Sequence, residues 1–193
     1  MVKTMEIRKE WAMPNGATFT IKPIKKLLSR YVGGGKGWID PFAGNNSPAE
    51  FTNDLNINTT AKEHKLALDF VKEQERSFIG CLFDPPYSGR QVSELYRQIK
   101  KVVHTDDTNA YFYSAVKDEL SKRIVANGVA ICFGWNSNGF GKKRGFTQEE
   151  ILLVAHGGAH NDTICVVERK IQQTLNDDAP FPPTDKSVGI HGE

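Results

Sequence analysis

Four consecutive residues combine a carboxylate, two rigid prolines and an aromatic ring: Asp84, Pro85, Pro86 and Tyr87. They follow the apolar run 78–83, which predicts a buried strand. The prolines stiffen the backbone and have no N–H to donate, so the carbonyls before and between them are expected to face outward as acceptors. A fixed edge of acceptors beside a flat ring suits a planar amine, such as the exocyclic amino group of adenine.

A second unusual stretch, Asp40, Pro41, Phe42, Ala43, Gly44, Asn45 and Asn46, lies about forty residues earlier and follows a predicted short strand at 38–40. Gly44 would let a ligand approach the backbone closely. Asn45 and Asn46 tolerate turn and left-handed conformations. These residues alone would fit an ordinary strand-to-helix turn equally well.

Two further acids end predicted strands. Asp54 ends the strand predicted at 50–54, and Asp69, followed by Phe70, ends the strand predicted at 66–68. A carboxylate at the end of the second strand can accept hydrogen bonds from both hydroxyls of a ribose, and the third position could bind an adenine. The alternatives are a turn aspartate at 54 and a helix N-cap at 69.

Apolar spacing predicts strands that alternate with helices, and hence a mostly parallel sheet with helices on both faces. The strands are expected at 38–40, 50–54, 66–68, 78–83, 129–133, 151–155 and 163–167. The helices are expected from Pro23 to Tyr31 and at 59–64, 92–103 and 113–124, the last one capped by Asn127 and Gly128. Residues 151–167 predict a closing hairpin, which makes the sheet mixed. If the strand order reverses between the two halves, the ends at Asp40 and Asp84 are neighbours in one crevice.

Composition fits one soluble α/β domain over residues 1–171, followed by a tail, 172–193, that is expected to be disordered. No apolar run is long enough to span a bilayer, and three cysteines within apolar runs suit a reducing cytoplasm. The net charge of +2 excludes a globally basic nucleic-acid binder, so any such contact needs a local patch. No metal is expected, because Gly157 and Gly158 break any helix between His156 and His160.

Taken together and in this order, the glycine loop, the two strand-end acids and Asp84–Tyr87 resemble the amino-group methyltransferases that use S-adenosylmethionine. Residues 40–46 resemble their first cofactor motif, residues 84–87 their catalytic motif, and residues 18–23 the segment that cradles the methionine moiety. The resemblance implies a Rossmann-like class I methyltransferase fold of about seven strands. It also implies S-adenosylmethionine as the cofactor, held by Thr20, Lys22, Pro23, Asp40, Pro41, Phe42, Gly44, Asn45, Asp54, Leu55, Asp69 and Phe70.

The aspartate form of the catalytic motif is typical of DNA adenine-N6 methyltransferases, and the motif order is similar to that of the small enzymes carried by bacteriophages. By this resemblance Asp84 and the Pro85 carbonyl accept the two N6 hydrogens, Pro86 holds the ring in place, and Tyr87 stacks on the extruded base. Two features depart from the family: Asn46 replaces the usual second glycine, and no segment of ordinary size remains for target recognition. We therefore expect a short or relaxed recognition sequence, and a homodimer is a plausible way to enlarge the DNA surface.

The best candidate for DNA contact is the loop 136–145, which follows a predicted strand and should open at the same edge as the catalytic motif. Its candidate residues are Asn138, Lys142, Lys143 and Arg144, with Arg90 as a further phosphate contact. A flexible solvated loop is the alternative. Two other functions remain open at this point: methylation of adenine in RNA, and a non-catalytic DNA-binding or partner module derived from a methyltransferase.

Overall fold

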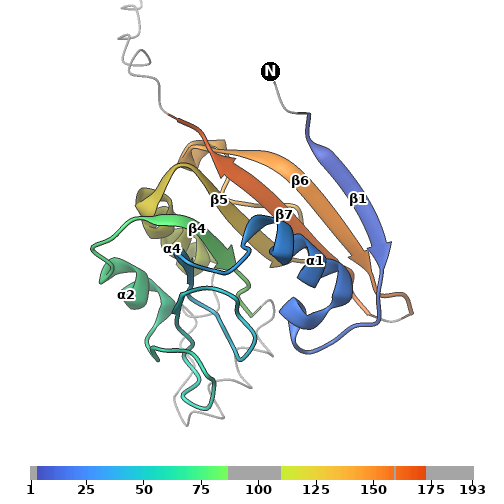
Figure 1. Ribbon diagram of the computed structural model, residues 1–193, viewed down its shortest axis with the longest axis horizontal. Helices are drawn as coiled ribbons and strands as arrows, with labels where there is room; N and C mark the ends of the chain where they lie inside the picture. Colours follow the sequence, from blue (N-terminus) through green and yellow to red (C-terminus); the bar gives the residue numbers. More distant parts are fainter. Residues whose placement is uncertain (1–3, 87–109, 159, 173–193) are drawn as a thin grey trace, which may run out of the picture.

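The computed structural model describes residues 4–86, 110–158 and 160–172. Within them a seven-stranded sheet has the order β1-β6-β7-β5-β4-β2-β3 (Figure 1). The strands are β1 Glu6–Trp11, β2 Trp38–Asp40, β3 Phe51–Thr52, β4 Phe78–Phe83, β5 Ile124–Gly134, β6 Phe146–Ala155 and β7 Thr163–Lys170. In the described part of the chain, no helix combines the length and the apolar character that crossing a membrane requires.

The strand directions confirm the predicted mixed sheet. β7 is antiparallel to both of its neighbours, β5 and β6, whereas the other pairs are parallel. The strand order reverses where β2 pairs with β4, because β3 continues the sheet on one side and β5 on the other. The carboxyl ends of β2 and β4 are therefore neighbours, as the sequence predicted, and this switch point is where ligands bind in open α/β sheets.

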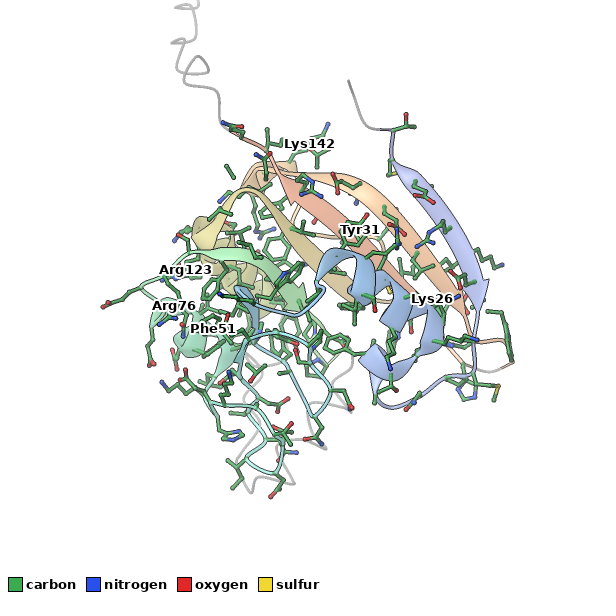
Figure 2. The ribbon with its side chains drawn as sticks, viewed as in Figure 1. Lys26, Tyr31, Phe51, Arg76, Arg123 and Lys142 are labelled. Atoms are coloured by element: carbon green, nitrogen blue, oxygen red, sulfur yellow. The ribbon has the colours of Figure 1, made fainter. Side chains whose placement is uncertain are left out.

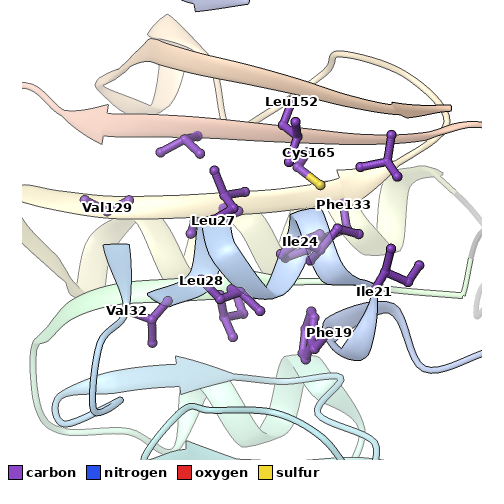
Figure 3. Packing of buried hydrophobic residues seen from close by; sticks show 14 of the residues in the cluster. Phe19, Ile21, Ile24, Leu27, Leu28, Val32, Val129, Phe133, Leu152 and Cys165 are labelled. Atoms are coloured by element: carbon purple, nitrogen blue, oxygen red, sulfur yellow. The ribbon is translucent and has the colours of Figure 1, made fainter. Parts of the chain in front are cut away.

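Helices cover both faces of the sheet. Helix α1, Lys22–Tyr31, packs on one face, and α2, Ala67–Lys72, and α4, Ala110–Arg123, belong to the core cluster of the other. Ile24, Leu27 and Leu28 of α1 lie in one cluster with Phe133, Leu152 and Cys165 of the sheet (Figure 3). The predicted apolar stripe of α1 is confirmed, and its burial anchors the segment that precedes the helix.

The strand predicted at 66–68 is wrong, because helix α2 begins at Ala67. Ala67, Phe70 and Val71 recur at helical spacing and are buried together. A short apolar run does not distinguish a strand from a buried helix, and here packing decided for the helix. The helix predicted at 59–64 is also wrong: Glu63 forms a parallel bridge with Asn53, and the Thr60 N–H donates to Asn45 Oδ1 at 2.8 Å.

Asn127 and Gly128 do not cap a helix. Helix α4 ends at Arg123, and the chain enters β5 directly at Ile124. Asn127 has a φ of 62° within β5, where the register against β4 shifts between Phe78 and Gly80. A left-handed residue suits a bulge as well as a helix end, so the local signal was ambiguous.

Strand β1 was missed in the sequence, where residues 1–20 gave no apolar alternation. It pairs with β6 as a parallel edge strand, and Arg8 reaches the buried Glu150 of β6. A polar edge strand is usual, because charges protect an open edge from pairing with other chains. The helix predicted at 92–103 lies outside the described residues, as does all of the predicted tail after Gln172.

Candidate active site

A cavity of about 310 Å³ opens where the carboxyl ends of β2 and β4 meet. It has three walls: the segment before α1, the loop after β2, and the first residue after β4. We call it the Gly44 cavity. It is lined by Gly16, Ala17, Thr18, Phe19, Phe42, Ala43, Gly44, Asn45, Asn46 and Asp84. Asp84 and the glycine loop therefore share one cavity, as the sequence predicted.

Two acids hold the glycine loop in shape. Asp40 is fully buried; its Oδ1 accepts from the Phe42 N–H at 2.9 Å, and its Oδ2 from the Ser47 hydroxyl at 2.6 Å. Asp54 Oδ2 accepts from the Gly44 N–H at 2.9 Å. Neither acid lines the Gly44 cavity, nor does Pro41. The structure thus places Asp40 and Asp54 directly behind the loop, where they fix its conformation.

Gly44 has a φ of +53°, a left-handed conformation that side chains other than glycine adopt at a cost. A Cβ at this position would project into open space, with no atom within 4 Å. The strand-to-helix alternative does not apply, since residues 41–50 form turns and no helix separates β2 from β3. The loop is therefore a turn with free space beside its glycine.

The segment before α1 lies at the cavity as expected, but the residues that face it differ from those predicted. Thr18 and Phe19 line the cavity. The Thr20 hydroxyl instead donates to the Ala17 carbonyl at 2.8 Å and accepts from Asn15, Lys22 is exposed, and Pro23 is buried in the first turn of α1. The lining from this segment therefore lies at Gly16–Phe19, a few residues before the predicted Thr20, Lys22 and Pro23.

Asp69 and Phe70 lie in helix α2 and do not end a strand, and neither residue lines the Gly44 cavity. Phe70 is 1% exposed and packs in the core, which leaves no ring face for a ligand. Asp69 is exposed in the first turn of α2. Leu55 is half-buried and does not line the cavity either.

The prolines of the catalytic motif face a second cavity, of about 550 Å³, on the α4 side of the sheet. We call it the Lys117 cavity. Its lining comprises Phe83, Pro85, Pro86, Tyr113, Ser114, Lys117, Cys132, Phe133, Gly134, Asn136, Asn138, Gly139 and Arg144. Residues 84–86 thus separate the two cavities. Tyr87 lies outside the described residues.

Helix α4 contributes two residues to this site that the sequence analysis did not single out. The Tyr113 hydroxyl donates to the Pro86 carbonyl at 3.0 Å and so orients the end of the motif. Lys117 Nζ donates to the Gly139 carbonyl at 2.9 Å and lies 5.0 Å from the ring centroid of Phe83. The apolar spacing of this helix suggested only a core face for Tyr113 and gave no sign of Lys117, because a polar tip on an amphipathic side chain leaves no mark in an apolar pattern.

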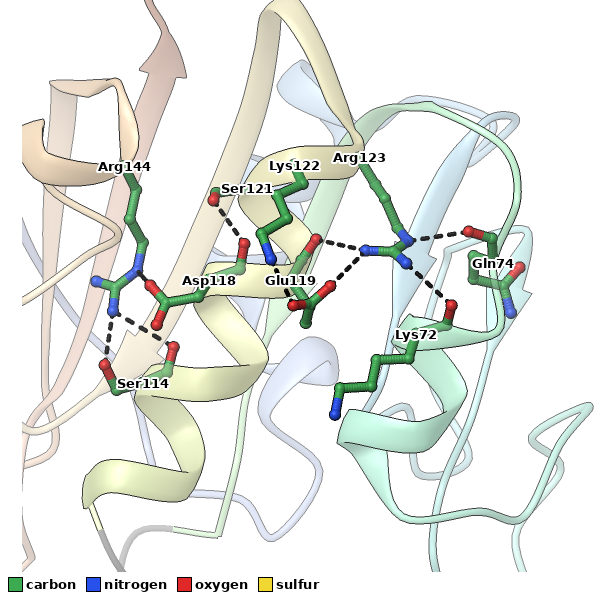
Figure 4. A network of polar contacts seen from close by, with 9 residues as sticks. All are labelled: Lys72, Gln74, Ser114, Asp118, Glu119, Ser121, Lys122, Arg123 and Arg144. Atoms are coloured by element: carbon green, nitrogen blue, oxygen red, sulfur yellow. Dashed lines mark hydrogen bonds and ion pairs between the residues drawn. The ribbon is translucent and has the colours of Figure 1, made fainter.

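The loop 136–145 does not present its cations as predicted. Arg144 is committed to helix α4: Nε pairs with Asp118 Oδ1 at 2.6 Å, and Nη2 donates to Ser114 Oγ at 2.7 Å (Figure 4). Lys142 and Lys143 are exposed, but they directly precede β6. Because β6 runs parallel to β5 and β4, its start lies at the opposite edge of the sheet from Asp84, which follows β4. Figure 2 shows Lys142 at the end of the sheet where β6 begins. Asn138 is exposed beside the Lys117 cavity, and Arg90 lies outside the described residues.

His156 has a structural role, because both of its ring nitrogens contact other parts of the chain. One ring nitrogen lies 2.8 Å from the Ala12 carbonyl, and the other lies 2.8 Å from Thr163 Oγ1. These bonds tie the segment after β1 to the closing hairpin. In residues 4–86, 110–158 and 160–172 no group of three His, Cys, Asp or Glu side chains is arranged to hold a metal.

Burial raises the pKa of Asp40 to about 7, and the nearby carboxyls of Asp84 and Asp54 act in the same direction, whereas the bonds from Ser47 and Phe42 oppose the shift. The folded protein then binds a proton that the unfolded chain has already released, so the contribution of Asp40 to stability is complete below its ordinary pKa and lost as the pH rises through about 7.

The side chain in Asp40→Asn stays neutral, so this substitution should remove the fall in stability with rising pH. Urea unfolding at about pH 5 and about pH 8 checks it; equal falls in both proteins would contradict it.

Comparison with solved structures identifies the fold. The N-methyltransferase NodS from Bradyrhizobium japonicum, solved with S-adenosylhomocysteine, superposes with a TM-score of 0.52 at 10% identity, over 78% of this chain and 87% of that one. A 1,6-didemethyltoxoflavin-N1-methyltransferase from Burkholderia thailandensis, also with S-adenosylhomocysteine, gives 0.51 at 13% identity over 78% of both chains.

TrmN from Thermus thermophilus gives a TM-score of 0.51 at 13% identity over 78% of this chain, which spans about half (49%) of the TrmN length. Neither a protein-family model nor a curated protein sequence matches the chain. At these identities the likeness concerns the fold, and it agrees with the strand order and the switch point. The chain has the Rossmann-like fold of the class I methyltransferases.

Proposed function

We propose that this protein is an S-adenosylmethionine-dependent methyltransferase that acts on the N6 amine of adenine in DNA. One observation carries the proposal: Asp84 lines the Gly44 cavity, and Pro85 and Pro86, the next two residues, line the Lys117 cavity. A transferase needs a donor site and an acceptor site that meet at one point. Asp84, Pro85 and Pro86 are three of the four residues of the catalytic motif, and their contact with both cavities supports this assignment.

The Gly44 cavity suits the cofactor. It has the volume of a small-molecule site, for which about 300–1,000 Å³ is usual. Apolar rings of Phe19 and Phe42 lie beside polar groups of Thr18 and Asn45, and the free space at Gly44 lets a ligand contact the backbone. Structural neighbours solved with S-adenosylhomocysteine support the assignment. When bound, S-adenosylmethionine would supply an activated methyl group.

The protein has to orient the amine more than to activate it. The N6 lone pair of adenine is delocalised into the ring, so the amine is a poor nucleophile. Asp84 and the Pro85 carbonyl accept the two N6 hydrogens and turn the lone pair toward the Gly44 cavity. Orientation of this kind can supply a large part of a rate enhancement. In a direct in-line displacement without a covalent enzyme intermediate, the N6–carbon bond would form as the carbon–sulfur bond of the sulfonium breaks. S-adenosylhomocysteine would leave, and the methylated amine would release one proton.

Adenine as the acceptor follows from the aspartate in the motif, and DNA follows from the resemblance to the phage-type enzymes. The base has to leave the duplex, which costs a few kcal/mol. Stacking on one aromatic ring contributes about 1–3 kcal/mol, and Tyr87 provides that ring in the sequence prediction. The Lys117 cavity, of about 550 Å³, is lined by Pro85 and Pro86 and has room for the extruded base.

One experiment tests the function. The purified protein is incubated with cofactor and unmethylated genomic DNA, and N6-methyladenine is mapped by sequencing; total RNA carries the parallel arm. We expect methyl transfer to DNA at a short or relaxed sequence. Transfer to RNA alone would replace the substrate, and DNA binding without any transfer would support a non-catalytic module.

A further inference from the structure

We infer that three lysines on the first half of helix α1 bind the phosphates of the DNA substrate; the inference rests on the proposed function. We call Lys22, Lys25 and Lys26 the α1 lysine row. Their spacing of three and four residues brings them to one face of the helix. All three are exposed, opposite the buried stripe of Ile24, Leu27 and Leu28.

The charge of α1 is one-sided. Its ten residues include Lys22, Lys25, Lys26 and Arg30, and none is acidic. Arg30 is bound by the buried Glu150. None of the three lysines forms an ion pair within the described ranges of the chain. A solvated surface helix normally mixes signs: in α4, Lys122 and Arg123 both pair with Glu119.

The position of the row within α1 is unfavourable for the isolated helix. A helix begins with exposed N–H groups and a partial positive charge, so acidic residues are favoured in its first turn and cations are not. Lys22 is the first residue of α1, and no acid follows it there. Like charges at i,i+4 repel as well. A polyanion bound against this face would offset both effects, since helix and lysines then attract the same phosphates.

The row lies at the edge of the sheet where the chemistry is proposed. Helix α1 directly follows the short helix η1, Thr18–Thr20, whose first two residues line the Gly44 cavity. At 1.5 Å per residue, Lys25 and Lys26 are about 5–6 Å along the axis from the first residue of α1. Figure 2 shows Lys26 toward the end of the sheet where β1 and β6 finish, and Lys142 at the opposite end. A duplex that delivers a base to Asp84 therefore passes close to the row.

The chain offers a matched control. Lys25→Glu/Lys26→Glu and Lys142→Glu/Lys143→Glu change two adjacent exposed lysines each and alter the net charge equally. Duplex binding of the full-length proteins is measured by fluorescence anisotropy over a series of salt concentrations. We expect the α1 variant to bind at least about 10-fold more weakly at low salt, with a slope of log K against log salt smaller by about 2. The control should bind like the wild type.

Two further measurements separate the explanations. Cofactor affinity, by calorimetry, should not change in the α1 variant, and its melting temperature should be no lower than that of the wild type, because two cations leave a helix N-terminus. If both variants lose duplex affinity equally, the loss is due to net charge alone and the inference is overturned. So would unchanged duplex binding in the α1 variant, or a loss confined to an RNA hairpin. If the wild type methylates DNA in that case, the proposed function survives; absence of any transfer to DNA refutes the function itself.

Discussion

Asp84→Asn is expected to lower the rate of methyl transfer by about 10²–10⁴-fold while cofactor affinity changes little. Asparagine has the same shape, but one acceptor oxygen becomes an amide NH₂ that faces the N6 hydrogens of the substrate. Pro85 and Pro86 keep the backbone in place, so the two cavities should persist. The side chain lines the Gly44 cavity at the point where donor and acceptor would meet. Loss of the Asp84 carboxylate should therefore lower the rate of methyl transfer.

Transfer of labelled methyl from cofactor to DNA, and calorimetry of cofactor binding, measure the two quantities separately. Glu75→Gln is the matched control, because it makes the same chemical change at an exposed carboxylate in the described chain. It should have wild-type activity and affinity. An Asp84→Asn protein that binds cofactor as poorly as it turns over would assign Asp84 to cofactor binding and remove it from the amine.

Glu150→Gln is expected to reduce the free energy of unfolding by about 2–4 kcal/mol. Glu150 is 1% exposed and accepts hydrogen bonds from Arg8 of β1, Arg30 of α1 and the Tyr31 hydroxyl, at 2.7 Å for Arg30 and 2.8 Å for Tyr31. Glutamine has no charge and one acceptor oxygen, so Arg30 loses its carboxylate partner and Arg8 keeps only the more exposed Glu6 and Glu10. The network joins β1, α1 and β6. The segment directly before α1 lines the Gly44 cavity.

The pH dependence of stability gives this prediction a second measurement. Burial alone would raise the pKa of Glu150, but the hydrogen bonds from Arg30, Tyr31 and Arg8 outweigh it and lower the pKa. Burial and the same carboxylate raise the pKa of Tyr31 to about 12. A carboxyl with a lowered pKa stabilises the fold above its ordinary pKa, and this contribution is lost as the pH falls through the lowered value. Glu150→Gln should lack this acid-side loss.

Urea unfolding of both proteins measures the difference. Glu73→Gln is the control, because it makes the same substitution in an exposed ion pair, that of Glu73 with Lys65. Exposed ion pairs contribute little, so this variant should unfold with the wild type. Equal midpoints for Glu150→Gln and Glu73→Gln would show that the buried network does not stabilise the fold.

Local chemistry made much of the site visible in the sequence. The apolar run before Asp84 became β4, and the helix stripe at Ile24, Leu27 and Leu28 was buried as expected. The expectation that the strand ends at Asp40 and Asp84 are neighbours depended on a reversal of the strand order, which is common in open α/β sheets. The pairing of β2 with β4 confirms it.

Other features depend on partners far away in the chain. The sequence of residues 66–71 fits a strand or a helix, and the burial of Phe70 and Val71 in the core decides for the helix. Strand β1 pairs with β6 although its residues do not form an apolar face. Arg144 forms an ion pair with Asp118 and a hydrogen bond with Ser114, both in α4, and no spacing in the sequence reveals these contacts.

The sequence by itself determined the acceptor-rich motif, the glycine loop and the apolar runs that became β2, β4 and α1, because stiffness, left-handed turns and apolar periodicity are local properties. The strand order depended on tertiary pairing, which placed the unpredicted β1 beside β6. Only the tertiary structure decided which of the cations remain free and at which edge of the sheet they lie. Charge has no periodicity of its own, so the partner of each charged side chain is known only once the elements have packed.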